Sequence, residues 1–233
     1  MNRTIAASLS TNRNGPLRAN RQASLRDLAY EAIKRQIVRS DLKPGEALTV
    51  TGIAEALGMG RTPVIQAIDR LTVDGLIVVM PRKGVVVSPV SLDNFIEIVE
   101  IRLLNEARAV RWAAERAGSA EVAQMSANLD ATWLAAKQGD IDEFIDLDRE
   151  FHQTIAHAAR NSVLSEFLGN LHEKALRFWF ISLRTPDHNL RICEEHAAIL
   201  EGIRNRDPDK AEKCIREHIS SFHANATNQI LRI

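Results

Sequence analysis

The pattern of hydrophobic and polar positions divides the chain into two parts. In residues 25–90, apolar residues first repeat at helical spacing and then gather in two short β-rich runs, whereas from residue 91 onward the spacing is helical throughout. We therefore predict a mainly α protein with an N-terminal domain over 25–90 and an all-α domain over 91–233. Residues 1–24 contain four arginines, no acidic residue and little periodicity. We interpret them as a flexible basic arm, either a solvated tail or an added minor-groove contact.

Helical and β-rich runs alternate in the N-terminal domain in the order of a winged helix-turn-helix. Glycine tolerates the turn conformations that separate such elements, and proline fits the first turn of a helix. The predicted elements are a helix over 25–38, a second helix over 51–57 that ends at Gly58-Met59-Gly60, a third helix that begins near Pro63 and ends at Gly75, and a hairpin of the runs 76–80 and 85–88.

A helix-turn-helix reads duplex DNA with its second helix, whose N-terminal end enters the major groove. In the third predicted helix, apolar residues form an inward stripe and polar residues face outward, while Pro-Arg-Lys-Gly forms the tip of the hairpin. The residues expected to contact DNA are Arg61, Thr62, Gln66 and Arg70 on the helix, and Arg82, Lys83 and Gly84 on the wing.

The formal net charge of zero conceals an asymmetry between the two domains. Residues 1–90 contain 13 Lys and Arg against 7 Asp and Glu, which leaves 17 against 23 for the remainder. A basic half that also carries the helix-turn-helix favours binding to phosphates. Neither a secretory signal nor a membrane-spanning run is recognised, so we expect a cytoplasmic protein without a membrane partner.

The second domain is predicted to be a six- or seven-helix bundle whose apolar stripes face one another. No β-rich run or glycine-rich phosphate loop interrupts it, which argues against a nucleotide-binding enzyme. The expected helices lie near residues 91–117, 119–137, 140–158, 162–183, 187–205 and 208–231.

Four polar residues fall in phase with these buried stripes. Asp148 and His152 lie one turn apart among Phe144, Phe151 and Ile155, and His196 and His218 lie in the stripes of the last two helices. One oxygen and three nitrogens suit a divalent ion such as zinc or nickel. Two alternatives stay open, namely hydrogen-bonded core histidines and a Cys2His2 set that uses Cys193 and Cys214.

The other histidines carry different expectations. His172 borders an apolar face beside Leu168, which suggests a residue of the core or one that supports the metal ligands. His157, His188 and His223 are expected to be exposed.

Two groups of segments resemble known families. The segments IKRQIVRSDLKPGEAL, IAEALGMGRTPVIQAIDRLTVDGLI and PRKGVVV resemble the DNA-binding domain of the GntR family of bacterial transcription regulators. The segments DREFHQTIAHAARN, EEHAAILEGIRNRDP and AEKCIREHI resemble the metal-binding motifs of the FCD effector domain of the FadR-type branch, and six helices are similar to its VanR-like subgroup. The chain departs from the family at Gly60, commonly Ser, and at Ile65-Gln66, commonly Arg-Glu.

The resemblance implies a ligand-responsive regulator, commonly a repressor, that binds a palindromic operator as a homodimer. It also implies that the metal holds a small carboxylate effector and that Arg102 lines the pocket, although Arg102 also has Glu106 one turn later as an ion-pair partner. Two other functions stay open. One is a metal-dependent hydrolase or lyase, for which Glu150 and Glu195 are the local base candidates, and the other is a bundle with only a structural zinc.

Overall fold

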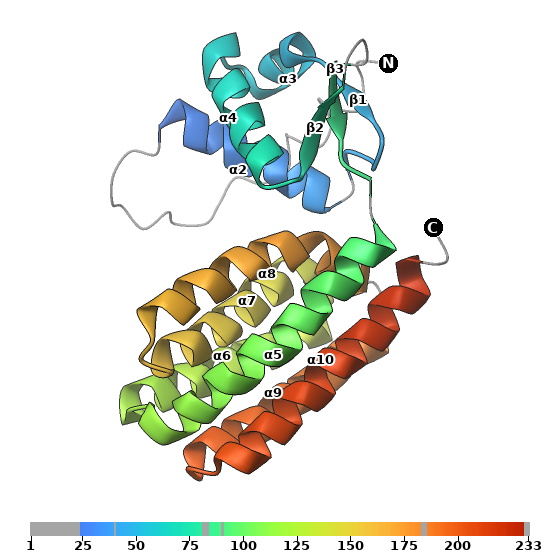
Figure 1. The fold of residues 1–233 in the computed structure, drawn as a ribbon. Helices are drawn as coiled ribbons and strands as arrows, with labels where there is room; N and C mark the ends of the chain where they lie inside the picture. Colours follow the sequence, from blue (N-terminus) through green and yellow to red (C-terminus); the bar gives the residue numbers. More distant parts are fainter. Residues whose placement is uncertain (1–23, 40, 81–83, 90, 183–185, 231–233) are drawn as a thin grey trace. The chain divides into compact units, whose positions relative to one another are not determined.

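The chain folds into two compact units, residues Met1–Val90 and Ser91–Ile233. The computed structural model describes residues 24–39, 41–80, 84–89, 91–182 and 186–230 (Figure 1). Of the predicted basic arm, only Ser24 belongs to the described residues. Its side chain accepts a hydrogen bond from the Asp27 amide and so caps the first described helix.

The first unit is a winged helix-turn-helix, as predicted. Gly58 ends the second helix in the left-handed conformation with φ +62°, and Gly60 is the N-cap of the third. The elements are α2 (Leu25–Val38), β1 (Ala47–Leu48), α3 (Val50–Leu57), α4 (Arg61–Val73), β2 (Ile77–Met80) and β3 (Gly84–Val87).

The sheet of this unit has a strand that the sequence pattern did not predict. Strand β3 pairs antiparallel with β2 and, on its other side, with β1, so that Ala47 faces Val86. A two-residue strand is too short to show an alternating pattern, and only its pairing partner identifies it. The expected hairpin is therefore two strands of a three-stranded sheet with the order β1-β3-β2.

Helix α4 has one face buried in the core of the first unit and one face exposed. Val64, Ala67, Ile68 and Leu71 are buried and pack with aliphatic side chains of α2, α3 and the sheet. Burial of this stripe leaves the opposite side of α4 exposed, because helix positions three and four apart share a face.

The described part of the second unit is an all-α bundle of six helices, which confirms the predicted fold class (Figure 1). Helix α10 packs along both α5 and α9, and α6 packs along α7. The helices are α5 (Leu92–Arg116), α6 (Ser119–Gln138), α7 (Ile141–Ala158), α8 (Ser162–Ser182), α9 (Pro186–Arg204) and α10 (Pro208–Ile230). No described helix has an apolar stretch long enough to cross a membrane.

Two features hold the helices of the bundle in register. The Phe95 ring of α5 lies 4.8 Å from the Phe178 ring and 5.5 Å from the Phe222 ring, which joins α5 to α8 and α10. At the turn between α9 and α10, a Cβ atom on Gly202 would lie only 2.8 Å from the Ala211 nitrogen. The absence of a side chain at Gly202 thus allows the two helices that carry His196 and His218 to approach closely.

Candidate functional site

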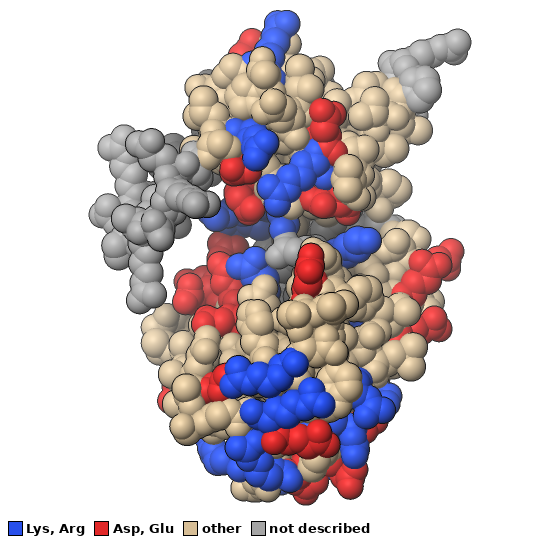
Figure 2. Space-filling view, turned by 60° about the vertical axis from the view of Figure 1, so that its left-hand side comes forward, with Lys and Arg blue, Asp and Glu red and all other residues tan. Residues whose placement is uncertain are grey.

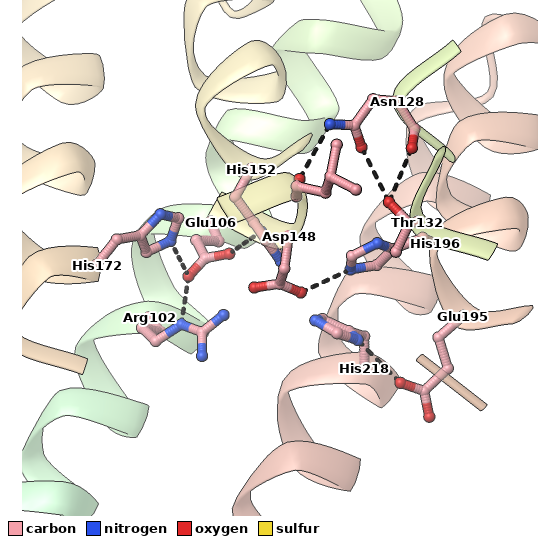
Figure 3. A network of polar contacts seen from close by, with 11 residues as sticks. Arg102, Glu106, Asn128, Thr132, Asp148, His152, His172, Glu195, His196 and His218 are labelled. Carbon is pink, nitrogen blue, oxygen red and sulfur yellow. Dashed lines mark hydrogen bonds and ion pairs between the residues drawn. The ribbon is translucent and has the colours of Figure 1, made fainter. Parts of the chain in front are cut away.

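Four polar side chains converge in the interior of the bundle. Asp148 and His152 come from α7, His196 from α9 and His218 from α10, and all four are buried (Figure 3). One candidate ligand atom from each residue lies within 4.8 Å of the others. The tertiary structure therefore brings together the four residues that the sequence pattern singled out on three separate helices.

The protonation of His196 and His218 suits metal binding. Burial holds the pKa of His196 and of His218 well below the ordinary value, and the neighbouring imidazoles add to the effect on His196. Both rings are thus neutral and have a lone pair to offer. Burial also raises the pKa of Asp148, so that without a cation nearby the ionised carboxylate is disfavoured.

His196 has an environment that a cation would complete. Its Nε2 lies 3.4 Å from Asp148 Oδ1, and neither ring nitrogen makes a hydrogen bond within the described part of the chain. The ring is stacked on Phe151 with the centroids 4.2 Å apart. A fully buried polar ring without hydrogen bonds is costly, and the donor set around it fits a divalent metal.

Two of the candidate ligand histidines each contact a carboxylate through Nδ1. Glu106 Oε2 lies 2.9 Å from His152 Nδ1, and Glu195 Oε2 lies 2.8 Å from His218 Nδ1. A carboxylate at one ring nitrogen orients the ring and makes the other nitrogen a better ligand. Glu195 was predicted from the sequence only as a candidate base. Its position beside His196 in the sequence was the signal that was missed.

Arg102 is paired with Glu106, as the alternative interpretation of this arginine predicted. Arg102 is fully buried, and its Nε donates a hydrogen bond of 2.5 Å to Glu106 Oε1. His172 Nε2 lies 3.1 Å from the same oxygen. Burial alone would raise the pKa of Glu106, but Arg102, His172 and His152 hold it well below the ordinary value. Glu106 is therefore an ionised link between Arg102 and the metal-ligand candidate His152.

Glu106, His152 and His172 also bring ligand atoms within 4.8 Å of one another. The guanidinium of Arg102 already neutralises Glu106 in this second group. A cation is therefore less favoured there than among Asp148, His196 and His218. Burial lowers the pKa of His172 to about 4, which keeps this ring neutral.

Two expectations about the other histidines were wrong. His188 is only 3% exposed, because it lies four residues before Ile192 and so shares the buried stripe of α9. His223 is partly buried, with its ring 5.6 Å from Phe95. His157 is exposed as predicted.

The Cys2His2 alternative receives no support from the described residues. Neither Cys193 nor Cys214 belongs to a described group of possible metal ligands. Cys193 is buried, and burial raises the pKa of its thiol to about 12, which favours the protonated form. Both cysteines are free thiols.

The expected DNA-contacting residues of α4 lie on its outward face. Arg61, Thr62 and Gln66 are exposed. Arg70 is exposed too, but its guanidinium stacks 3.8 Å from the centre of the Tyr30 ring and lies 3.6 Å from Asp27. Figure 2 shows that basic and acidic side chains are interspersed on the face it draws.

On the wing, Gly84 begins β3 with a φ of +74°, a conformation that favours glycine. Arg82 and Lys83 lie outside the described residues.

Comparisons with known proteins cover both units. The FCD domain model matches residues 97–221, and the model of bacterial regulatory proteins of the gntR family matches residues 25–87. The HTH-type transcriptional regulator YdhC of Bacillus subtilis (strain 168) is 28% identical over 193 residues, 82% of this chain and 86% of YdhC. The HTH-type transcriptional repressor RspR of Escherichia coli (strain K12) is 25% identical over 193 residues, 83% of this chain and 85% of RspR. The solved structure of E. coli McbR/YncC is similar with a TM-score of 0.78 at 26% identity, and the match covers 90% of this chain and 100% of that chain.

We expect the metal-free protein to lose stability as the pH falls. The pKa of His172 is about 4 in the folded protein, compared with about 6.5 in an unfolded chain. Its depressed pKa contributes stability that is present above about pH 6.5 and is lost as the pH falls toward 4. Between about pH 6.5 and 5 this histidine alone removes about 2 kcal/mol from the free energy of unfolding.

Urea unfolding of the metal-free protein at the two pH values measures this loss. The variant His172→Gln should lose less free energy of unfolding between the two pH values than the wild type. The variant His157→Gln, at an exposed histidine, should lose as much as the wild type. An equal pH dependence in all three proteins would contradict the assignment.

Proposed function

The chain belongs to the GntR family of bacterial regulatory proteins, in the branch with an FCD domain, and on that premise we propose a regulator that responds to a small organic acid held at a divalent metal ion. The matched families and relatives are transcription regulators rather than enzymes. We therefore set aside the metal-dependent hydrolase or lyase. Glu195, one of its base candidates, is in contact with His218 Nδ1, where it serves to orient a ligand.

The observation that carries the proposal is the buried set of Asp148, His152, His196 and His218. These four would hold the metal through one oxygen and three nitrogens, a donor set that suits zinc or nickel. When bound, the ion would supply Lewis acidity and positive charge in the interior of the bundle. Glu106 and Glu195 would keep the rings of His152 and His218 oriented toward it.

The charge balance of the interior supports an anionic effector. Arg102 and Glu106 neutralise each other, and Asp148 compensates one of the two charges of a divalent cation. One positive charge then remains in a buried place, where an unpaired charge is costly. A carboxylate of a small organic acid would neutralise it.

Arg102 is proposed to orient this acid. The guanidinium of Arg102 lies in the same buried polar network as Asp148 (Figure 3). Its positive charge opposes the rise in the pKa of Asp148 that burial causes. The pair with Glu106 fixes the side chain of Arg102 through Nε. A guanidinium held in this way binds a carboxylate by charge-assisted hydrogen bonds.

The outward face of α5 supports a homodimer. Leu104 is 67% exposed and Ile101 38% exposed near the middle of this helix. Glu97 and Glu100 are exposed before them, and Arg108 is exposed after them. When two copies of α5 pack antiparallel across a two-fold axis at Leu104, Glu100 of one copy faces Arg108 of the other. The surface is thus complementary to itself, as a two-fold interface requires.

DNA binding and effector binding would be coupled in the dimer. A two-fold protein matches a palindromic operator because each half-site receives one α4. An effector that favours one placement of the two DNA-binding units changes operator affinity by roughly 1–3 kcal/mol. Release of DNA on effector binding, the behaviour of a repressor, is the direction that we propose.

The first test concerns the metal and the effector. We expect His218→Ala to abolish stoichiometric zinc or nickel binding, measured by elemental analysis after dialysis, and Glu195→Gln to weaken it by about 10–100-fold. His157→Ala should bind metal like the wild type. Citrate and simple dicarboxylates should raise the melting temperature of the metal-loaded protein but not that of the metal-free protein.

Tight metal binding without any response to carboxylates would favour a closed structural zinc over the effector site. Full metal binding by His218→Ala would contradict the ligand assignment itself.

The second test concerns DNA. Arg61→Ala should weaken specific operator binding by about 1–3 kcal/mol, because Arg61 stands at the N-terminal end of α4. Fluorescence anisotropy at fixed salt measures the effect. Lys43→Ala, which removes an exposed cation from the turn before β1, should have a much smaller effect. Equal affinities of the two variants would contradict the docking of α4.

The third test concerns the dimer. Leu104→Glu places like charges near the two-fold axis and should raise the dimer dissociation constant by about tenfold or more. Sedimentation velocity measures this constant. Val163→Glu, at a residue of α8 that is 77% exposed, should leave it unchanged. A dimer that tolerates Leu104→Glu does not use this face of α5.

A further inference from the structure

The outward face of α4 carries one apolar side chain that the fold does not use. Ile65 is 46% exposed. It takes no part in the hydrophobic core of the first unit, which includes even the partly buried Val50, Leu57 and Met59. Packing within the unit therefore does not account for an isoleucine at this position.

Its neighbours on that face are all polar. Arg61 lies four residues before Ile65, Thr62 three before it and Asp69 four after it, and all of them are exposed, as is the adjacent Gln66. Single exposed aliphatic residues are ordinary on protein surfaces and need no special explanation. This one differs by its place, because it stands in the middle of the face that is expected to enter the major groove.

An isoleucine side chain has no donor or acceptor with which to read a base edge. Among the four bases, only thymine presents an apolar group in the major groove, its 5-methyl group. Against guanine or cytosine, Ile65 would remove water from polar base atoms without replacing their hydrogen bonds, which is unfavourable.

We propose that Ile65 is a specificity-determining residue that recognises a thymine in each operator half-site by packing against its 5-methyl group. The inference rests on the proposed function, in which α4 lies in the major groove. Arg61 on the preceding turn and Gln66 beside Ile65 then contact phosphates or polar base edges around this thymine.

The experiment uses the full-length protein and DNA fragments selected by it from a random duplex library. In a recovered operator, each thymine is replaced in turn by deoxyuridine, which keeps Watson–Crick pairing but lacks the 5-methyl group. At one position of the half-site, wild-type affinity should fall about fourfold, and replacement in both half-sites should lower it about 15-fold.

Two variants test whether Ile65 causes the sensitivity to deoxyuridine. Ile65→Ala should bind the thymine operator more weakly than the wild type and should not distinguish thymine from deoxyuridine at that position. Val73→Ala removes another exposed aliphatic side chain, 85% exposed, from the C-terminal end of α4 and should keep the full sensitivity to deoxyuridine. Both residues are exposed, so thermal unfolding should show that both variants are folded.

The outcomes separate this inference from the function on which it rests. A wild-type protein that binds thymine and deoxyuridine operators equally at every position would overturn the role of Ile65. So would an Ile65→Ala variant that keeps the sensitivity, for example through the methyl group of Thr62. Failure of the library to yield any enriched sequence would overturn the proposed function, and this inference with it.

Discussion

The burial of charge inside a helical bundle is the constraint on which the second unit depends. Arg102, Glu106 and Asp148 are all buried, and each isolated ion would cost several kcal/mol. The ion pair between Arg102 and Glu106 offsets the cost of burying these two charges. Glu106 also contacts His152 and His172. Asp148 lies instead among three imidazoles, two of which burial keeps neutral. In the described interior, the negative charge of Glu106 is thus neutralised by Arg102, whereas the surroundings of Asp148 suit a cation.

Local features of the helices place these side chains with little freedom. Gly202 allows α9 and α10 to meet closely, and the aromatic contacts of Phe95 tie α5 to α8 and α10. Glu106 and Glu195 then set the ring orientation of His152 and His218. A small shift of one helix changes several of these contacts together, because a packed core tolerates few intermediate arrangements. The geometry of the candidate site therefore depends on the packing of several helices and not on any single one.

Periodicity predicted the long elements of the fold well, because each helix buries one continuous stripe. The stripe of Phe144, Phe151 and Ile155 on α7 identified Asp148 and His152 as inward-facing residues. Periodicity did not predict one short strand, and the positions of two polar side chains were predicted wrongly or missed. Strand β1 has only two residues and exists because β3 pairs with it. His188 was expected at the surface although it is in phase with Ile192, and Glu195 reaches His218 from the margin of the stripe.

The sequence by itself determined the fold class, the two faces of α4 and the inward orientation of Asp148, His152, His196 and His218, since these follow from side-chain chemistry at fixed helical spacing. Only the tertiary structure decided which of the inward residues meet. It joined Glu106 to His152 and His172, placed Glu195 beside His218 and left both cysteines out of the described ligand groups. The physical reason is that periodicity specifies direction within one helix, whereas contact depends on the rotation and height of each helix relative to its neighbours, which the packing of the whole core sets.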